Sequence, residues 1–299
     1  MRASRRSLLL GAAAAALAAC HRSGGERPPP PPIGGAWRTL DFAPSAGSPE
    51  GERALLLTGI GPGAPVLVAL HGRGESARGL DVGASAWPRE YELDRIHRRL
   101  LAPPLTDADL LGIVDPARLA ALNASVEKAP YKGLALATPY APDLPDKSAG
   151  GAQGYARFVI DALLPRARAE ADASTERART GIDGVSMGGR LALLVGLTHP
   201  DVFATVGALQ PAIRAEEAPM LAALAASAVK AGVRLRLVSS HGDYFLPAVR
   251  ALAAELDRIG VAHELLLIPG DHGYAFNRGP GGAELLLWHE RVLRGLPAP

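Results

Sequence analysis

The sequence contains almost no cysteine. Cys20 is the one cysteine among 299 residues, so the chain cannot close an internal disulfide. It also contains no Cys/His cluster with the spacing of metal ligands and no periodic repeat. We therefore expect no metal site. We expect a domain held together by its hydrophobic core, for which a hydrophobic content of 48% is sufficient.

An excess of either charge sign is also lacking after residue 19. The formal net charge of +2 includes Arg2, Arg5 and Arg6, and residues 1–19 contain no acidic side chain. Removal of this segment leaves a net charge of about −1. A nearly neutral domain gives no reason to expect a nucleic-acid partner.

The first 19 residues predict export. Ser4-Arg5-Arg6 resembles a twin-arginine signal, and the apolar run that follows is too short to span a membrane comfortably. Leu17 to Cys20 resembles the lipobox of bacterial lipoproteins, which implies cleavage before Cys20 and lipid attachment to its sulfur. We therefore expect an exported protein, anchored by lipid to a membrane on the periplasmic or cell-surface side. The alternative is that Cys20 is only a small residue of a cleavage region.

A proline-rich segment, residues 20–35, predicts an extended tether before one α/β domain over residues 36–299. In that domain, apolar segments typical of buried strands alternate with segments of helical spacing. This order predicts a mostly parallel sheet with helices on both faces. The expected strands are residues 36–42, 53–58, 65–71, 134–138, 179–183, 203–209, 233–239 and 264–268, and the expected helices are residues 155–171, 187–198, 215–230 and 248–260.

Residues 83–132 interrupt this alternation. We expect helices over residues 90–101 and 107–121, and a segment of this length is typical of a lid or a substrate wall. A solvated decoration is an equal alternative. Trp87, Tyr91 and Tyr131 are suited either to line a pocket or to pack as local core.

Ser186 lies in the sequence Gly184-Val185-Ser186-Met187-Gly188-Gly189, between a predicted strand and a predicted helix. The pattern G-x-S-x-G in this context indicates a nucleophile elbow, a tight turn that exposes a serine hydroxyl. Gly184 and Gly188 leave room for the backbones to approach. The alternative is an ordinary glycine-rich turn.

A second loop, His71-Gly72-Arg73-Gly74, follows a continuous apolar strand. Loops of this composition supply half of an oxyanion hole, because small residues allow a backbone N–H to face the reacting carbonyl. We expect the donors to be the N–H groups of Arg73 and Met187. We expect His71 to be a structural hydrogen-bonding residue under the loop.

Asp243 and His272 each follow a predicted strand, at residues 233–239 and 264–268. Serine is a weak nucleophile, so it requires a base, and the base requires a group that orients it. The chain order Ser186, Asp243, His272 is that of the serine hydrolases with this kind of sheet. His241 and Asp271 are weaker candidates, because His241 shares a loop with Asp243 and Asp271 adjoins the histidine.

With these motifs in place, the chain resembles the α/β-hydrolase superfamily, in particular the esterase group that includes esterase D-like and ferric enterobactin esterase-like enzymes. The resemblance covers residue 37 to the C-terminus without residues 83–132, and it implies ester hydrolysis with no metal or organic cofactor. Gln210-Pro211 departs from it, since a serine is expected before the proline. The matching segments are residues 71–74, 155–165, 184–189, 199–203, 242–247 and 270–272.

These observations favour a lipid-anchored serine esterase that acts through an acyl-enzyme on a small-molecule or polymer-derived ester. Simple acyl esters, feruloyl esters, polyester oligomers and siderophore lactones all remain possible substrates. Two alternatives stay open: a peptidase of the prolyl-oligopeptidase type, and a lipoprotein that keeps the fold only for binding.

Overall fold

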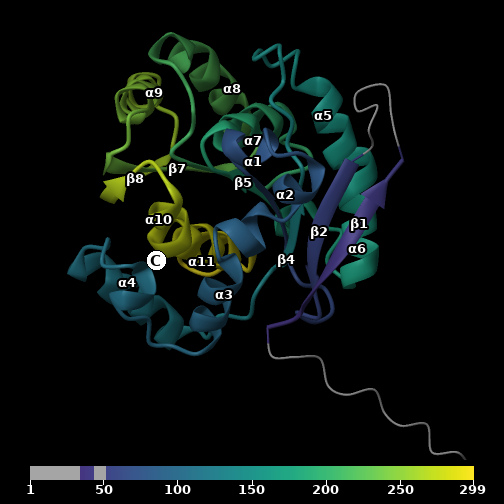
Figure 1. Ribbon diagram of the computed structural model, residues 1–299. Coiled ribbons are helices and arrows are strands. Elements are labelled where there is room, and N and C mark those ends of the chain that lie inside the picture. Colours follow the sequence, from purple (N-terminus) through teal and green to yellow (C-terminus); the bar gives the residue numbers. More distant parts are fainter. Residues whose placement is uncertain (1–33, 44–51) are drawn as a thin grey trace, which may run out of the picture. The chain divides into compact units, whose positions relative to one another are not determined.

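The computed structural model describes residues 34–43 and 52–299 (Figure 1), which fall in one compact unit. The export signal, Cys20 and most of the expected tether lie outside the described residues. Eight strands form one sheet in the order β1-β2-β4-β3-β5-β6-β7-β8. The strands are β1 (Ala36–Phe42), β2 (Glu52–Thr58), β3 (Val66–Leu70), β4 (Ala135–Pro139), β5 (Thr180–Gly184), β6 (Thr205–Leu209), β7 (Arg234–Gly242) and β8 (Glu264–Asp271).

The sheet is mostly parallel, as predicted. The pairings of β1 with β2 and of β2 with β4 are antiparallel, and the pairings from β4 through β3 to β8 are parallel. All strand predictions are confirmed to within about three residues at each end, which is the usual uncertainty of a boundary predicted from sequence. The carboxyl ends of the parallel strands therefore lie along one edge of the sheet, where ligands bind in open α/β sheets.

Helices cover both faces of the sheet (Figure 1). Alternate residues of β3 show the reason, because Val66, Val68 and Leu70 belong to one hydrophobic core, and Leu67 and Ala69 belong to the other. Side chains alternate between the two faces of a strand, so an entirely apolar strand is buried on both. The main helices are α3 (Leu93–Leu101), α4 (Pro116–Lys128), α5 (Gln153–Arg157), α6 (Leu164–Ala171), α7 (Met187–Thr198), α8 (Ala218–Lys230), α9 (Leu246–Arg258) and α11 (Gly282–Leu293); the shorter ones are α1 (Arg73–Ser76), α2 (Leu80–Ala84) and α10 (Tyr274–Phe276).

The insertion, residues 83–132, contributes many side chains to one of these two cores. Trp87, Tyr91 and Tyr131 are all at most 4% exposed and pack in the same cluster as apolar side chains of α11. The interpretation as local core is therefore correct for Trp87 and Tyr131, while Tyr91 packs in this core and also lines a cavity beside Ser186. A solvated decoration would not bury its aromatic side chains, so that alternative is wrong for this segment.

The helix expected over residues 107–121 is wrong at its start. A 3-10 turn covers Ala108–Leu110, and Leu111 and Gly112 then adopt left-handed backbone angles, with φ of 59° and 70°. Helix α4 begins only at Pro116, whose missing N–H suits a first helical position. The regular leucine spacing of the segment continues across this break, which explains why the pattern predicted a single helix.

Helix α11, near the C-terminus, has no counterpart among the sequence expectations. It carries charged side chains that the structure buries, including Glu284, His289 and Glu290. A pattern search for apolar residues misses such a helix because its polar groups find partners only in the folded chain. None of the helices within residues 34–43 and 52–299 is long and apolar enough to cross a membrane.

Candidate active site

Ser186 stands on a tight turn between β5 and α7. Its backbone angles, φ 57° and ψ −119°, are unusual for a residue with a side chain. The turn is held by the backbone, since Ser186 N–H donates to the carbonyl oxygen of Leu209 at 2.9 Å. A side chain on Gly188 would place its Cβ 2.4 Å from the carbonyl oxygen of His71. The glycine is therefore required for the close approach of α7 to the loop after β3.

His272 lies directly after β8 and faces this serine. Its Nε2 is 3.1 Å from Ser186 Oγ, and its Nδ1 is 2.9 Å from Asp243 Oδ1. The fold thus brings the three residues singled out in the sequence into one hydrogen-bonded chain. Because Asp243 accepts at Nδ1–H, the Nε2 of the neutral ring is free to accept the serine proton.

Asp243 is 4% exposed, and its carboxylate is fully engaged. Besides His272, its Oδ1 accepts the N–H of Phe245 at 3.0 Å, and its Oδ2 accepts the Ser239 hydroxyl at 2.6 Å. These bonds hold an ionised carboxylate in one orientation. Sequence reasoning missed Ser239, whose only signal is its position as a serine near the end of a strand.

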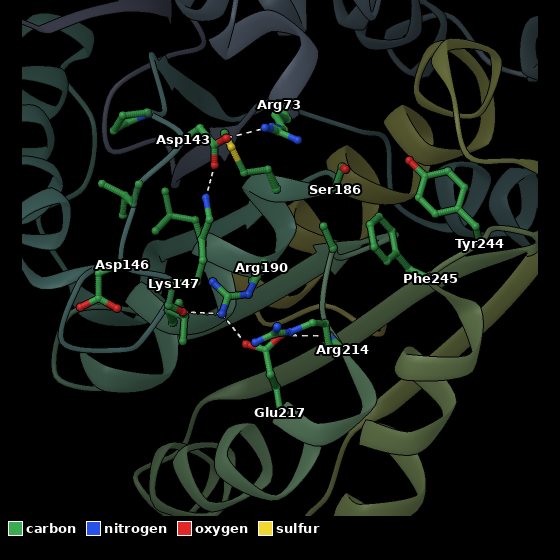
Figure 2. A pocket seen from close by; sticks show the side chains of 16 residues that line it. Arg73, Asp143, Asp146, Lys147, Ser186, Arg190, Arg214, Glu217, Tyr244 and Phe245 are labelled. Atoms are coloured by element: carbon green, nitrogen blue, oxygen red, sulfur yellow. Dashed lines mark hydrogen bonds and ion pairs between the residues drawn. The ribbon is translucent and has the colours of Figure 1, made fainter.

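The two predicted oxyanion donors are the first residues of helices, Arg73 of α1 and Met187 of α7. The first N–H groups of a helix have no intrahelical acceptor, so both N–H groups are available to a ligand. The Arg73 side chain is exposed and lines a pocket beside Ser186, and its Nε donates to Asp143 Oδ2 at 2.8 Å (Figure 2). The contribution expected of Arg73 to the oxyanion hole is that of its backbone N–H.

His71 is completely buried, and both ring nitrogens are occupied. Its Nε2 accepts the N–H of Ala141 at 2.8 Å, so the ring proton is on Nδ1, which donates to the carbonyl oxygen of Gly72 at 2.8 Å. Burial lowers the pKa of His71 to about 4. These contacts agree with a structural residue under the loop. Of the weaker candidates, His241 and Asp271 are both exposed.

Gln210, at the position where the resemblance leads us to expect a serine, also touches this region. It is completely buried with a left-handed φ of 42°. Its Nε2 donates to Ser240 Oγ at 2.6 Å and to the carbonyl oxygen of Asp271 at 3.1 Å. The glutamine therefore joins the end of β6 to the ends of β7 and β8, the two strands that carry Asp243 and His272.

A pocket of about 520 Å³ opens beside Ser186 (Figure 2). Apolar side chains line part of it and charged side chains line the rest, with Arg190 paired to Glu217 and Asp143 paired to both Lys147 and Arg73. Apart from Arg73, these charged residues, which lie on separate elements, were missed by sequence reasoning. No residue of the insertion lines this pocket, so the insertion is not its wall. The apolar lining includes Pro142, Leu144, Met187, Leu191, Leu194, Ala212 and Phe245.

A smaller cavity of about 220 Å³ also reaches Ser186 and lies next to the loop after β3. Its lining includes Glu75, Tyr91 and Tyr274. Tyr91 is the single contribution of the insertion to either cavity. Across the described part of the chain, no group of three or more His, Cys, Asp or Glu side chains is arranged to hold a metal ion.

The sequence matches a family model described as "Putative esterase" over residues 127–261, a stretch that contains Ser186 and Asp243 and ends before His272. No curated protein matches the chain by sequence.

Several solved structures share the fold. A ferulic acid esterase superposes with a TM-score of 0.60 at 15% identity, covering 86% of this chain and 98% of that chain. For the S-formylglutathione hydrolase FrmB from Staphylococcus aureus the TM-score is 0.57 at 17% identity, covering 85% and 98%. For the enterobactin esterase FES from Shigella flexneri it is 0.54 at 20% identity, covering 85% of this chain and 59% of that chain. These likenesses and the mixed eight-stranded sheet identify the fold of this chain as the α/β-hydrolase fold.

Proposed function

We propose that the protein is a serine carboxylic-ester hydrolase that works through a Ser186-Asp243-His272 triad. The observation that carries the proposal is the unbroken chain of hydrogen bonds, 3.1 Å from Ser186 Oγ to His272 Nε2 and 2.9 Å from His272 Nδ1 to Asp243. The family match over residues 127–261 supports the same reaction class.

In the proposed reaction, Ser186 Oγ attacks the ester carbonyl carbon while its proton passes to His272 Nε2. The negative charge that develops on the carbonyl oxygen is stabilised by the N–H groups of Arg73 and Met187. Asp243 stabilises the imidazolium. Collapse of the intermediate breaks the ester bond, and His272 returns the proton to the departing alkoxide, leaving an acyl-enzyme on Ser186. Water activated by His272 then releases the acid by the same steps.

The pocket beside Ser186 suits an apolar acyl group. Its lining includes aliphatic and aromatic side chains, among them Met187, Leu191 and Phe245, and its volume of about 520 Å³ is that of a small-molecule site. The substrate is accordingly an ester of a small molecule or a fragment of a polymer. Among the structural neighbours, one is titled a ferulic acid esterase and another an enterobactin esterase, so feruloyl esters and siderophore lactones belong in the substrate panel with simple esters.

The export proposal rests on residues 1–20 of the sequence. Twin-arginine export, cleavage before Cys20 and lipid attachment would place the hydrolase on the periplasmic or cell-surface side of a membrane. Metabolic labelling with palmitate tests this proposal. Label that is incorporated into the full chain and lost in Cys20→Ala supports the anchor, and equal label in both chains contradicts it.

The hydrolase proposal is tested with Ser186→Ala and the matched control Ser227→Ala, which alters an exposed serine on α8. Turnover of aryl esters of graded acyl length and labelling by a fluorophosphonate, located by mass spectrometry, are the two readouts. We expect Ser186→Ala to lose both turnover and label, and Ser227→Ala to keep both. A folded wild-type protein without label on Ser186 would overturn the mechanism and leave a binding lipoprotein as the better account.

A further inference from the structure

Glu75, in the short helix α1, joins three parts of the chain that are distant in sequence. It is 3% exposed. Its Oε2 accepts the hydroxyl of Tyr91, from the insertion, at 2.5 Å, and its Oε1 accepts the hydroxyl of Tyr274, from α10, at 2.5 Å. Glu75 itself lies two residues after Arg73, the proposed oxyanion donor. One buried carboxylate thus contacts the insertion, the oxyanion loop and the segment after His272.

The contact with Tyr91 extends to the backbone of the oxyanion loop. The Tyr91 hydroxyl donates to Glu75 and at the same time accepts the N–H of Gly72 at 3.1 Å. The next peptide group, which carries the Arg73 N–H, is held from its other end, because His71 Nδ1 donates to the Gly72 carbonyl oxygen at 2.8 Å. Two consecutive peptide planes are therefore fixed by side chains. Oxyanion donors stabilise charge only when they are held in place before the reaction.

The contact with Tyr274 reaches the proposed base. Tyr274 follows His272 by two residues and donates its hydroxyl to Glu75. The Glu75 carboxylate therefore holds both the oxyanion loop, through Tyr91, and the segment that carries the His272 imidazole. Both tyrosines remain hydrogen-bond donors at neutral pH. Burial, with the nearby Glu75 carboxylate, raises the pKa of Tyr91 well above its ordinary value, and the hydrogen bond to Glu75 raises the pKa of Tyr274.

We propose that Glu75, acting through Tyr91 and Tyr274, is a positioning residue that sets the Arg73 N–H relative to His272 and Ser186. The insertion then serves the reaction by supplying the Tyr91 hydroxyl, although none of its residues lines the pocket of about 520 Å³ and only Tyr91 lines the smaller cavity. This inference rests on the proposed hydrolase function.

The test removes the Tyr91 hydroxyl alone. The ring packs edge-on against Trp87, with ring centroids 4.9 Å apart, and Tyr91→Phe keeps that contact. The matched control is Tyr131→Phe, a second buried tyrosine of the insertion, whose hydroxyl bonds His97 and lies outside both cavities. Both variants lose one buried hydroxyl, so their thermal midpoints report the structural cost.

We expect Tyr91→Phe to lower kcat about tenfold or more, less than the 10²–10³-fold loss caused by deleting a donor outright. KM and the pH midpoint of kcat/KM stay unchanged, because the acyl pocket and His272 are not touched. We expect Tyr131→Phe to keep the wild-type kcat. Equal kcat in the two variants, or a change confined to KM, would overturn the proposal.

Two further variants keep the test informative if Tyr91→Phe does not fold. Tyr274→Phe alters a side chain that is 41% exposed, and Glu75→Gln keeps the shape of the carboxylate while replacing one acceptor by an amide. Each is expected to lower kcat by about three- to tenfold with KM unchanged, because each loosens one brace without removing a donor. Wild-type kcat in both would contradict the proposal.

Ser186→Ala separates the positioning role of Glu75 from the hydrolase function on which it rests. Activity that survives Ser186→Ala refutes the hydrolase mechanism itself.

Discussion

Asp243 and His272 lie 29 positions apart in the chain, and the fold brings Asp243 Oδ1 to 2.9 Å from His272 Nδ1. The reason is the pairing of β7 with β8. These strands are parallel neighbours, and their register places Gly242 opposite Asp271. Asp243 and His272, which directly follow these two residues, therefore emerge at the same edge of the sheet and lie within hydrogen-bonding reach of each other.

Replacement of Asp243 by Asn tests the acid of the proposed triad. We expect kcat to fall about 10³- to 10⁴-fold, because an amide neither stabilises the imidazolium nor enforces the Nδ1–H tautomer. Steady-state kinetics on an aryl ester measure the loss. Asp271→Asn is the control, since Asp271 is the exposed neighbour of His272. A greater loss in Asp271→Asn than in Asp243→Asn would reverse the assignment.

Replacement of Gly188 by Ala tests the close approach of α7 to the loop after β3. The added Cβ would lie 2.4 Å from the His71 carbonyl oxygen and 2.5 Å from that of Leu70. Neither backbone can yield easily, so we expect a loss of about 3 kcal/mol in the free energy of unfolding, measured with urea. Gly154→Ala is the control in helix α5, where an added Cβ meets nothing within 4 Å. That variant should be neutral or stabilised by up to about 1 kcal/mol.

The buried ring of His71 predicts a pH dependence of stability. Its pKa in the folded chain is about 4, below the ordinary value of 6.5. As the pH falls, His71 is therefore protonated in the unfolded chain before it is protonated in the folded chain. The free energy of unfolding decreases between pH 6.5 and 4, by at most about 3 kcal/mol. Above pH 6.5 this group contributes no slope.

Urea unfolding at several pH values measures this slope. In His71→Asn the free energy of unfolding should depend less steeply on pH. The dependence that remains is expected to come from His97, because burial lowers its pKa as well. An unchanged slope in His71→Asn would show that His71 is not the group responsible.

Replacement of Leu144 by Trp tests the apolar pocket as the acyl site. Leu144 is partly exposed and lies on a loop of the pocket wall, so a larger side chain there fills the pocket at little cost to folding. We expect kcat/KM to fall at least about tenfold for long acyl chains, the scale of discrimination in a hydrophobic pocket, and to change little for acetate esters. Met220→Trp, on the exposed side of α8, is the control. An unchanged chain-length profile would place the acyl group elsewhere.

Much of the fold was predictable because its periodic signals are strong. The strand at residues 36–42 and the helix at residues 187–198 have the predicted bounds. Local patterns failed where the backbone turns without a break in the leucine spacing, as at Leu111 and Gly112, and where a helix buries charge, as α11 does. In α11, Glu284 is paired with Arg236 of β7 and Arg118 of α4, contacts that no local pattern contains.

The sequence by itself determined the elements of the site: a serine at a strand-to-helix turn, a glycine-containing loop after a buried strand, and an acid and a histidine after later strands. These signals are local, since they depend on strand ends and on glycine. The tertiary structure decided which acid meets His272, that Ser239 bonds that acid, and that Tyr91 of the insertion bonds the loop after β3. These contacts join residues brought together by strand order and helix packing, and their distances depend on the whole sheet and on both cores.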